Sequence, residues 1–285
     1  MTRERLIYLP LGGAGEVGMN AYVYGYGPKN RERYIVVDLG VTFPDMDGTP
    51  GVDLIMADIA WLEERRDRLE AIFITHAHED HVGGLGHLWD RLRAPIYARA
   101  FTARIATKKM IEAGQPADQV ITVGAMPDVV ELGPFHVQFV PVSHSLPEAS
   151  GLLIDTPAGR ILHTGDFKLD MAPGVGEPFD EEMFRAIGDK GVDTLVCDST
   201  NIFSLHPGRS ESSLPGAITE LVRDAEGMVI ATTFASNVAR VRTLATAGRA
   251  AGRSVCLLGR AMQNMVRTAT ETKLLHDFPQ TVSAE

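Results

Sequence analysis

The chain has 285 residues, a hydrophobic content of 45% and a formal net charge of −10. Its length exceeds one average domain and its apolar content is sufficient for a core, so one large unit or two units are expected. The acidic balance argues against a broadly basic nucleic-acid-binding surface, which would normally give a high isoelectric point.

Short strands alternate with helices in the first part of the chain. Apolar and β-branched runs bounded by turn residues predict strands at 6–11, 21–26, 34–38, 71–75, 96–98, 135–142, 151–155, 160–164 and 194–198. Helical periodicity predicts helices at 57–68, 84–93, 101–113 and 181–190. This pattern indicates sheets with helices on their outer faces.

The rhythm changes after residue 215. Helices are predicted at 216–224, 237–250 and 261–273, with strands at 228–234 and 254–258 between them. The alternation is typical of a βαβ-type unit. We therefore expect a first domain at 1–215 and the beginning of a second, α/β domain at 216–285.

Residues 13–18 read G-A-G-E-V-G and match the G-x-G-x-x-G pattern of dinucleotide-binding proteins, with Asp38 in the position expected for a ribose ligand. That pattern should open a helix, whereas residues 19–26 are aromatic and β-branched like a strand. A tight hairpin that passes under the neighbouring loop at 75–84 is the better prediction, with Glu16 and Asn20 bonding to nearby backbone.

Residues 75–84 read T-H-A-H-E-D-H-V-G-G and follow the apolar run 71–74 directly. Imidazole and carboxylate are ligands that Zn²⁺ and its neighbours accept, and a short loop can aim several of them at one point. His76 and His78 can reach one ion, while Asp80 and His81 fall on a turned segment and would reach a second ion beside it. The alternative is a solvated histidine-rich loop, but four such groups are rarely assembled at one strand end.

Two further ligands are expected at the ends of other apolar strands. His144 follows the run 140–142, and Asp166 follows the run 161–162. The two carboxylate oxygens of Asp166 can bridge two cations, so a two-metal centre is predicted. Five histidines lie inside a strand or lack supporting neighbours and are left out of the site: His87, His136, His163, His206 and His276.

The combination of motifs resembles a known family. H-A-H-E-D-H at 76–81, S-H-S at 143–145 and T-G-D at 164–166 are similar to motifs of the metallo-β-lactamase fold, an αββα sandwich. Longer motifs resemble those of the ribonuclease J group, in the β-CASP branch of that superfamily. They lie at 12–20, 37–45, 163–170, 197–201 and 232–240. The implied fold is α/β, a metallo-β-lactamase-like sandwich followed by the beginning of an α/β β-CASP domain.

The resemblance implies a role for each matching residue. His76, His78 and His144 would hold a first metal, Asp80 and His81 would hold a second, and Asp166 would bridge the two. Asp38 matches a strand-end acid that supports the ligand loop. Catalytic roles would belong to Asp80, Asp166 and Asp198. Without the resemblance, a helix or turn cap remains the alternative for Asp198.

The resemblance also implies a metal-dependent ribonuclease with two divalent cations, Zn²⁺ foremost and Mn²⁺ or Mg²⁺ as alternatives. It would act as a 5′-to-3′ exonuclease on 5′-monophosphorylated RNA, with additional endonuclease activity, in RNA decay and in rRNA and mRNA maturation. The full-length form would be a homo-oligomer, a dimer or tetramer. A further second-metal histidine and the residues that hold the substrate phosphate would lie beyond Glu285. Two alternatives stay open, a small-molecule hydrolase of the thioesterase or lactamase type and a non-catalytic RNA-binding subunit.

Cysteine usage and hydropathy predict the compartment. Cys197 and Cys256 are the only cysteines and each lies in an apolar run, so buried thiols in a reducing compartment are expected. No apolar run approaches the length of a membrane span and the N-terminus lacks a signal-type cleavage site, so we expect a cytoplasmic protein. Residues 229–270 carry six arginines and no acidic residue, which indicates either a phosphate-binding face or solvated helices.

Overall fold

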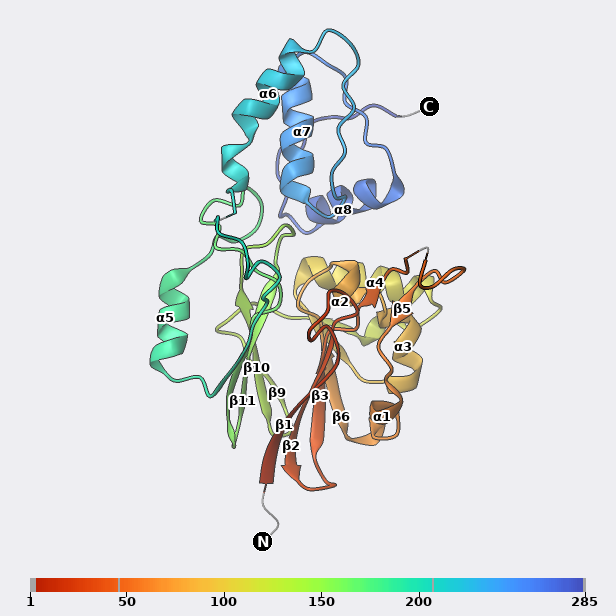
Figure 1. The fold of residues 1–285 in the computed structure, drawn as a ribbon, viewed down its shortest axis with the longest axis vertical. Coiled ribbons are helices and arrows are strands. Elements are labelled where there is room, and N and C mark those ends of the chain that lie inside the picture. Colours follow the sequence, from red (N-terminus) through yellow and green to blue (C-terminus); the bar gives the residue numbers. More distant parts are fainter. Residues whose placement is uncertain (1–3, 46, 207, 284–285) are drawn as a thin grey trace.

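Two mixed β-sheets stacked face to face form the larger part of the protein (Figure 1). The computed structural model describes residues 4–45, 47–206 and 208–283. The first sheet contains, in spatial order, β1 (Glu4–Gly12), β2 (Ala21–Pro28), β3 (Arg33–Val37), β6 (Leu69–Phe73), β7 (Ile96–Ala98) and β8 (Val120–Thr122). The second contains β13 (Thr194–Val196), β12 (Gly159–His163), β11 (Ser150–Thr156), β10 (Phe135–Pro141) and β9 (Val130–Leu132). A separate two-stranded ladder joins β4 (Val41–Thr42) to β5 (Ile55–Met56).

Successive residues of a strand pack into different cores. Ala71 and Phe73 of β6 face the second sheet, where the rings of Phe73 and Phe139 lie 6.0 Å apart between centroids. Ile72 and Ile74 point to the opposite side and pack under the helices. A strand that is covered on both faces needs apolar residues at every position, and this explains the continuous run 71–74.

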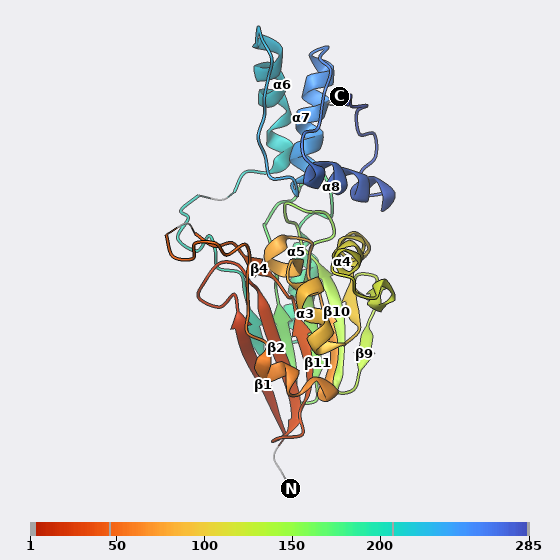
Figure 2. The same cartoon turned by 90° about the vertical axis from the view of Figure 1, so that its right-hand side faces the viewer.

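Helices cover both outer faces, so the layers follow the order αββα (Figures 1 and 2). The first sheet is covered by α1 (Ala60–Glu63), α3 (Leu85–Leu92) and α4 (Ala100–Glu112), and the second by α5 (Glu181–Asp189). Short connections include α2 (Glu79–Val82) and the 3₁₀ helices η1 (Arg66–Arg68), η2 (Ala117–Gln119) and η3 (Glu211–Ser213). The predicted αββα sandwich is confirmed. Of the helices that the structure describes, none combines the length and apolar character needed to cross a membrane.

Three helices form the last part of the chain and lie beyond the end of the sandwich that is opposite the N-terminus (Figures 1 and 2). They are α6 (Pro215–Asp224), α7 (Val238–Ala250) and α8 (Arg260–Glu271), close to the predicted positions. α8 contacts α4 of the sandwich, because Lys108 Nζ donates to Thr268 Oγ1 at 2.8 Å and Arg104 pairs with Glu271 at 3.1 Å.

The two strands predicted between these helices are not formed, so the expected βαβ unit is wrong for this structure. Residues 228–234 carry no strand, and residues 254–258 contribute only the bridge of Cys256 to Val282. A strand needs a neighbour for its backbone hydrogen bonds, and within the described residues these segments have none beyond that bridge. The apolar side chains of Met228, Ile230 and Phe234 are consequently exposed.

Both cysteines are exposed free thiols, so the expectation of burial is wrong. Cys197 follows β13, which lies at the edge of its sheet with a neighbour on one side only. Cys256 lies in the segment that forms only one bridge. An apolar run predicts burial only where elements cover it on both sides.

Three arginines of the acid-free segment 229–270 bond to residues outside it. Arg240 pairs with Glu211 at 3.1 Å, and Arg242 and Arg253 donate to the carbonyl oxygens of Gly174 and Gly227 at 2.9 and 2.6 Å. These side chains therefore hold α7 and its following loop to the rest of the chain.

Candidate metal centre

The ligand loop begins where two parallel strands end side by side. β3 and β6 pair in parallel up to Val37 and Phe73, so Asp38 and the loop from Thr75 onward leave the sheet at the same edge. Asp38 N donates to Phe73 O at 2.8 Å, and the Asp38 carboxylate accepts from Thr75 N at 2.8 Å. This pairing fixes the direction in which the histidine-rich loop starts.

His144 and Asp166 reach the same edge from the second sheet. Each lies three residues beyond its strand, β10 or β12, and these strands run in the same direction because both are antiparallel to β11. Lys168 N donates to Ser143 O at 2.7 Å, so the two loops are joined by backbone. The prediction that polar residues after separate apolar strands would converge is confirmed by the positions of these two side chains.

A first group of side chains contains His76, His78, His144 and Asp166, with one potential ligand atom from each lying within 4.8 Å of the others. His78 Nδ1 lies 3.0 Å from His76 Nε2 and 3.1 Å from His144 Nε2. Asp166 Oδ2 lies 3.9 Å from the Nε2 atoms of both His76 and His144. Three imidazoles and one carboxylate oxygen therefore face a common point.

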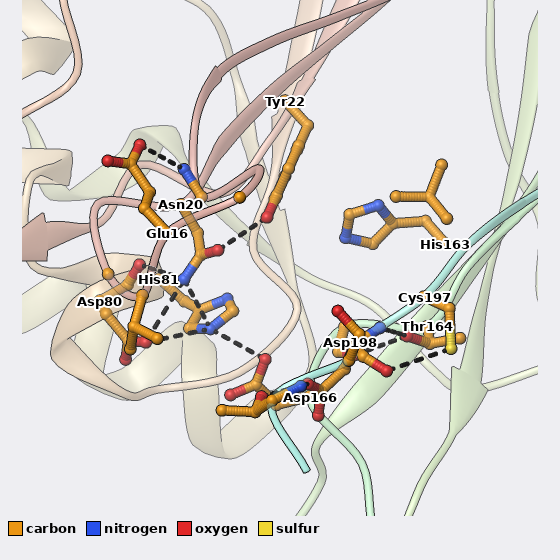
Figure 3. A pocket seen from close by; sticks show the side chains of 18 of the residues that line it. Glu16, Asn20, Tyr22, Asp80, His81, His163, Thr164, Asp166, Cys197 and Asp198 are labelled. Atoms are coloured by element: carbon orange, nitrogen blue, oxygen red, sulfur yellow. Dashed lines mark hydrogen bonds and ion pairs between the residues drawn. The ribbon is translucent and has the colours of Figure 1, made fainter. Parts of the chain in front are cut away.

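A second group contains Asp80, His81 and the other oxygen of Asp166 (Figure 3). His81 Nε2 lies 3.3 Å from Asp166 Oδ1 and 3.6 Å from Asp80 Oδ2. Asp166 thus directs Oδ2 to the first group and Oδ1 to the second. That is the arrangement expected of a carboxylate placed between two cations.

The hairpin between β1 and β2 holds the backbone of Asp80 by hydrogen bonds. Asn20 donates to Asp80 O through its backbone N at 2.9 Å and its side-chain Nδ2 at 3.0 Å, and Tyr22 OH donates to Asn20 Oδ1 at 2.8 Å (Figure 3). Gly13 N donates to Glu16 Oε1 at 3.2 Å. β1 and β2 pair antiparallel, so the glycine motif opens a strand as predicted and the bonding of Glu16 and Asn20 to backbone is confirmed.

Burial keeps the imidazoles of the first group unprotonated. It lowers the pKa of His78 to about 3 and that of His144 to about 4, and for His78 the charge of His144 adds to the effect. The pKa of His76, which is completely buried, is also lowered well below its ordinary value by burial and by the neighbouring rings. Neutral imidazoles keep the lone pairs that a metal requires.

The second group concentrates negative charge. Burial opposes a proton on His81, but Asp38 and Asp166 on either side hold its pKa well above the ordinary value. Burial also opposes ionisation of Asp166, yet the hydrogen bond from His81 and its charge lower the pKa of Asp166 to about 2. A point flanked by carboxylates in a buried setting attracts positive charge.

These distances and donor types fit a dinuclear metal centre. Zinc–ligand bonds of about 2.0–2.1 Å in a tetrahedral arrangement place neighbouring ligand atoms roughly 3.3 Å apart. The separations of 3.0 and 3.1 Å around His78 and of 3.3 Å between His81 and Asp166 are close to that value. Nitrogen and carboxylate donors suit Zn²⁺ and its first-row neighbours.

Asp198 belongs to neither group but lines a cavity beside the second group. The cavity, about 440 Å³, is lined by Asp80, Asp166, Asp198 and Tyr22 among others. The Asp198 carboxylate accepts from Thr200 N at 2.8 Å, so it caps the turn that follows, and Asp198 N donates to Thr164 Oγ1 at 3.0 Å. The alternative of a turn cap is therefore realised, and Asp198 also faces the cavity (Figure 3).

Two residues escaped the interpretation of the sequence. Thr75 is buried, and its hydroxyl lies between Asp38 and His76 at 2.8 and 3.0 Å. His163, which the sequence pattern does not assign to the site, lines the cavity and its Nδ1 lies 2.9 Å from Tyr24 OH. Threonine directly before the first histidine was the available signal for Thr75, whereas nothing local marks His163. The other four excluded histidines are exposed and belong to neither group: His87, His136, His206 and His276.

Comparison with known proteins defines the class. Residues 14–214 match the family model of the metallo-beta-lactamase superfamily. The chain therefore belongs to the metallo-β-lactamase superfamily. Residues 226–284 match the model described as Ribonuclease J, beta-CASP domain, so the resemblance noted in the motifs is confirmed.

Two curated relatives point to one group within that class. The chain is 47% identical over 272 residues to a protein named Ribonuclease J from Sinorhizobium meliloti, covering 95% of this chain and 48% of the relative. It is 41% identical over 253 residues to Ribonuclease J of Corynebacterium glutamicum, covering 88% of this chain and 34% of the relative. The chain thus spans about half, or less, of the length of these relatives.

A solved structure shares the fold. The crystal structure of a protein of unknown function from Enterococcus faecalis V583 aligns with a TM-score of 0.59 and 21% sequence identity. The alignment covers 92% of this chain and 67% of that one.

Proposed function

We propose that this protein hydrolyses RNA phosphodiesters with the help of two divalent cations. The observation that carries the proposal is Asp166, whose two carboxylate oxygens face two separate groups of histidine and aspartate side chains. The similarity to proteins named Ribonuclease J directs the chemistry toward RNA. Bound cations would supply a water of lowered pKa and neutralise charge on the attacked phosphate.

The roles of the chain's own residues follow from their positions. His76, His78 and His144 would hold the first cation, Asp80 and His81 the second, and Asp166 both. Asp80 is the better placed acceptor for a proton released in the reaction, because burial raises its pKa and its side chain lines the cavity. We assign Asp198 a place on the cavity wall, where its carboxylate would help to orient the substrate.

Finer features of the proposal rest on the same relatives. We propose Zn²⁺ as the preferred cation, 5′-monophosphorylated RNA as the substrate and 5′-to-3′ exonuclease action with additional endonuclease cleavage, in decay and maturation of RNA in the cytoplasm. We also propose a homo-oligomer and a division of the chain near residue 215. The family models, which meet between residues 214 and 226, support that division.

The test compares Asp166→Asn with Asp189→Asn, which removes an exposed carboxylate at the end of α5. Both are made in the longest natural form that contains residues 1–285 and are supplied with Zn²⁺ or Mn²⁺ and single-stranded RNA labelled at a 5′ monophosphate. Release of labelled mononucleotide indicates exonuclease action, and longer labelled fragments indicate endonuclease action. We expect Asp166→Asn to abolish cleavage and Asp189→Asn to preserve it.

Two outcomes would refute the proposal. Cleavage by Asp166→Asn at the unaltered rate would remove the bridging carboxylate from the mechanism. Turnover of thioester or lactam substrates by a protein that leaves RNA intact would identify a small-molecule hydrolase instead.

A further inference from the structure

The side chain of Thr75 connects a buried carboxylate to a histidine of the first group. Thr75 Oγ1 lies 2.8 Å from Asp38 Oδ2 and 3.0 Å from His76 Nδ1. Asp38 is completely buried and Thr75 almost completely, so no solvent competes for these contacts. Asp38 Oδ2 also lies 2.7 Å from His81 Nδ1, in the second group.

The direction of these hydrogen bonds follows from the chemistry of the partners. An ionised carboxylate only accepts, and a hydroxyl has one hydrogen to donate. Thr75 Oγ1 donates that hydrogen to Asp38, so toward His76 it can only accept. His76 must therefore carry its hydrogen on Nδ1, and its Nε2 lone pair faces His78 and His144.

His81 follows the same logic without an intermediary. Its Nδ1 donates to Asp38 Oδ2, which leaves Nε2 directed at Asp166 and Asp80. The 3.4 Å contact between His81 Nδ1 and Thr75 Oγ1 is longer and secondary. Asp38 thus takes a hydrogen bond from Nδ1 of one histidine in each group, directly from His81 and through Thr75 from His76.

We propose that Thr75 is a positioning residue that links His76 to Asp38 through its hydroxyl, so that one buried carboxylate holds the Nδ1 hydrogen of one histidine in each metal group and thereby sets the ring tautomer of His76. The effect on metal binding rests on the proposed function, whereas the predicted positions of the ring hydrogens do not depend on it. His78 provides the contrast, because its outer nitrogen Nε2 lies 3.2 Å from the Ser145 hydroxyl, which can donate or accept.

Three variants separate the relay from simple packing. Thr75→Val keeps the shape but removes the hydroxyl, and Thr75→Ser restores it. Thr102→Val is the matched control, because Thr102 is also fully buried and its hydroxyl has no hydrogen-bond partner among the residues that the structure describes. A role in packing alone would make the two valine variants behave alike.

Asp38→Asn should reverse the relay. Thr75 N donates to Asp38 Oδ1 at 2.8 Å, so an asparagine would keep its oxygen there and place its NH₂ group at the position of Oδ2. That NH₂ donates to Thr75 Oγ1, and the hydroxyl then donates to His76 Nδ1. The hydrogen of His76 moves to Nε2, where it points into the metal group.

The first measurement is the ring tautomer, read from long-range ¹H–¹⁵N correlations of protein labelled with ¹⁵N-histidine and free of metal. We expect His76 to carry its hydrogen on Nδ1 in the unaltered chain, in Thr75→Ser and in Thr102→Val. Asp38→Asn should show the hydrogen on Nε2, and Thr75→Val a mixture of both forms.

The second measurement is zinc affinity by competition with a chromophoric chelator. Thr75→Val should lower the zinc affinity of the first group about tenfold or more, as loss of a group that orients a metal-bound histidine commonly does. Asp38→Asn should lower the zinc affinity of both groups. Thr75→Ser and Thr102→Val should bind as the unaltered chain does.

The relay is overturned if His76 of the unaltered chain carries its hydrogen on Nε2, a result that needs no variant to fold. It is also overturned if Thr102→Val weakens zinc as much as Thr75→Val. A chain that binds no zinc at all but shows the expected tautomers would refute the proposed metal centre and leave the relay intact.

Discussion

Gly40 provides a sharp test of how the second metal group is positioned. Gly40 follows β3 and lies against the backbone of the ligand loop, where an added Cβ would be 1.6 Å from Asp80 O. Real Cβ atoms essentially never come closer than 3.0 Å, so Gly40→Ala requires a displacement of about 1.4 Å. Both neighbours are backbone, and no side chain can rotate away to make room.

The expected cost combines strain with lost hydrogen bonds. Overpacking of a filled core costs about 1–3 kcal/mol. Asp80 O accepts from Asn20 N and from Asn20 Nδ2, and weakening each bond costs about 1 kcal/mol. We therefore expect Gly40→Ala to lower the free energy of unfolding by about 3–5 kcal/mol. Because ligands must be held within about 0.5 Å, we also expect it to weaken binding of the second cation by about tenfold or more.

Gly188→Ala is the matched control. Gly188 lies in α5 with ordinary backbone angles and nothing within 4 Å of an added Cβ, so alanine should stabilise the chain by about 0.5–1 kcal/mol. Urea unfolding of the metal-free chains measures stability, and zinc titration measures the number of tight sites. If Gly40→Ala unfolds like the unaltered chain and still binds two cations, the close backbone contact does not position Asp80.

Three further predictions concern groups outside the metal ligands. Tyr24→Phe leaves His163 Nδ1 without its partner in a buried setting and should cost about 1–3 kcal/mol in urea unfolding, whereas Tyr8→Phe, at a half-exposed ring, should change little. Burial opposes ionisation of Asp170, but hydrogen bonds from Ser210 and from the N–H groups of Ala172 and Glu211 lower its pKa in the folded chain. The ionised carboxylate therefore stabilises the fold at pH values above the pKa that Asp170 has in the unfolded chain. This stabilisation is lost as the pH falls through the pKa that Asp170 has in the folded chain. Asp170→Asn should therefore reduce the loss of stability on acidification, and parallel acid unfolding curves would contradict this. Both thiols should react with a thiol reagent without denaturant, and a chain that reacts only after unfolding would show Cys197 and Cys256 to be covered.

The convergence of the candidate ligands could be predicted because its information is local. The loop 76–81 carries four candidate ligands within six residues, and His144 and Asp166 each follow a recognisable apolar strand. Strands that end at one edge deliver such residues to one place whatever the details of packing. The identity of the ligand atoms could not be predicted, since Nδ1 of His78 but Nε2 of His76 and His144 face the group only through the paths of their separate loops.

Longer-range features needed the register of the sheets. Thr75 meets Asp38 because β3 and β6 pair in parallel with Val37 opposite Phe73, and no spacing along the chain encodes that pairing. The strand predicted at 228–234 is not formed, because these residues have strand character but no neighbouring strand among the described residues with which to form a ladder. Residue type determines what a segment favours, and partners determine whether it is formed.

The position of the site across the two sheets links metal binding to the integrity of the sandwich. His76 belongs to the first sheet's edge and His144 to the second's, and Ser150 N of β11 donates across to Thr75 O at 3.1 Å. A cation held by both histidines is therefore a cross-link between the sheets. Binding that requires the folded arrangement stabilises it by about 2.7 kcal/mol when the free cation is present at about one hundred times its dissociation constant. The cross-link acts at the edge where both sheets end in loops.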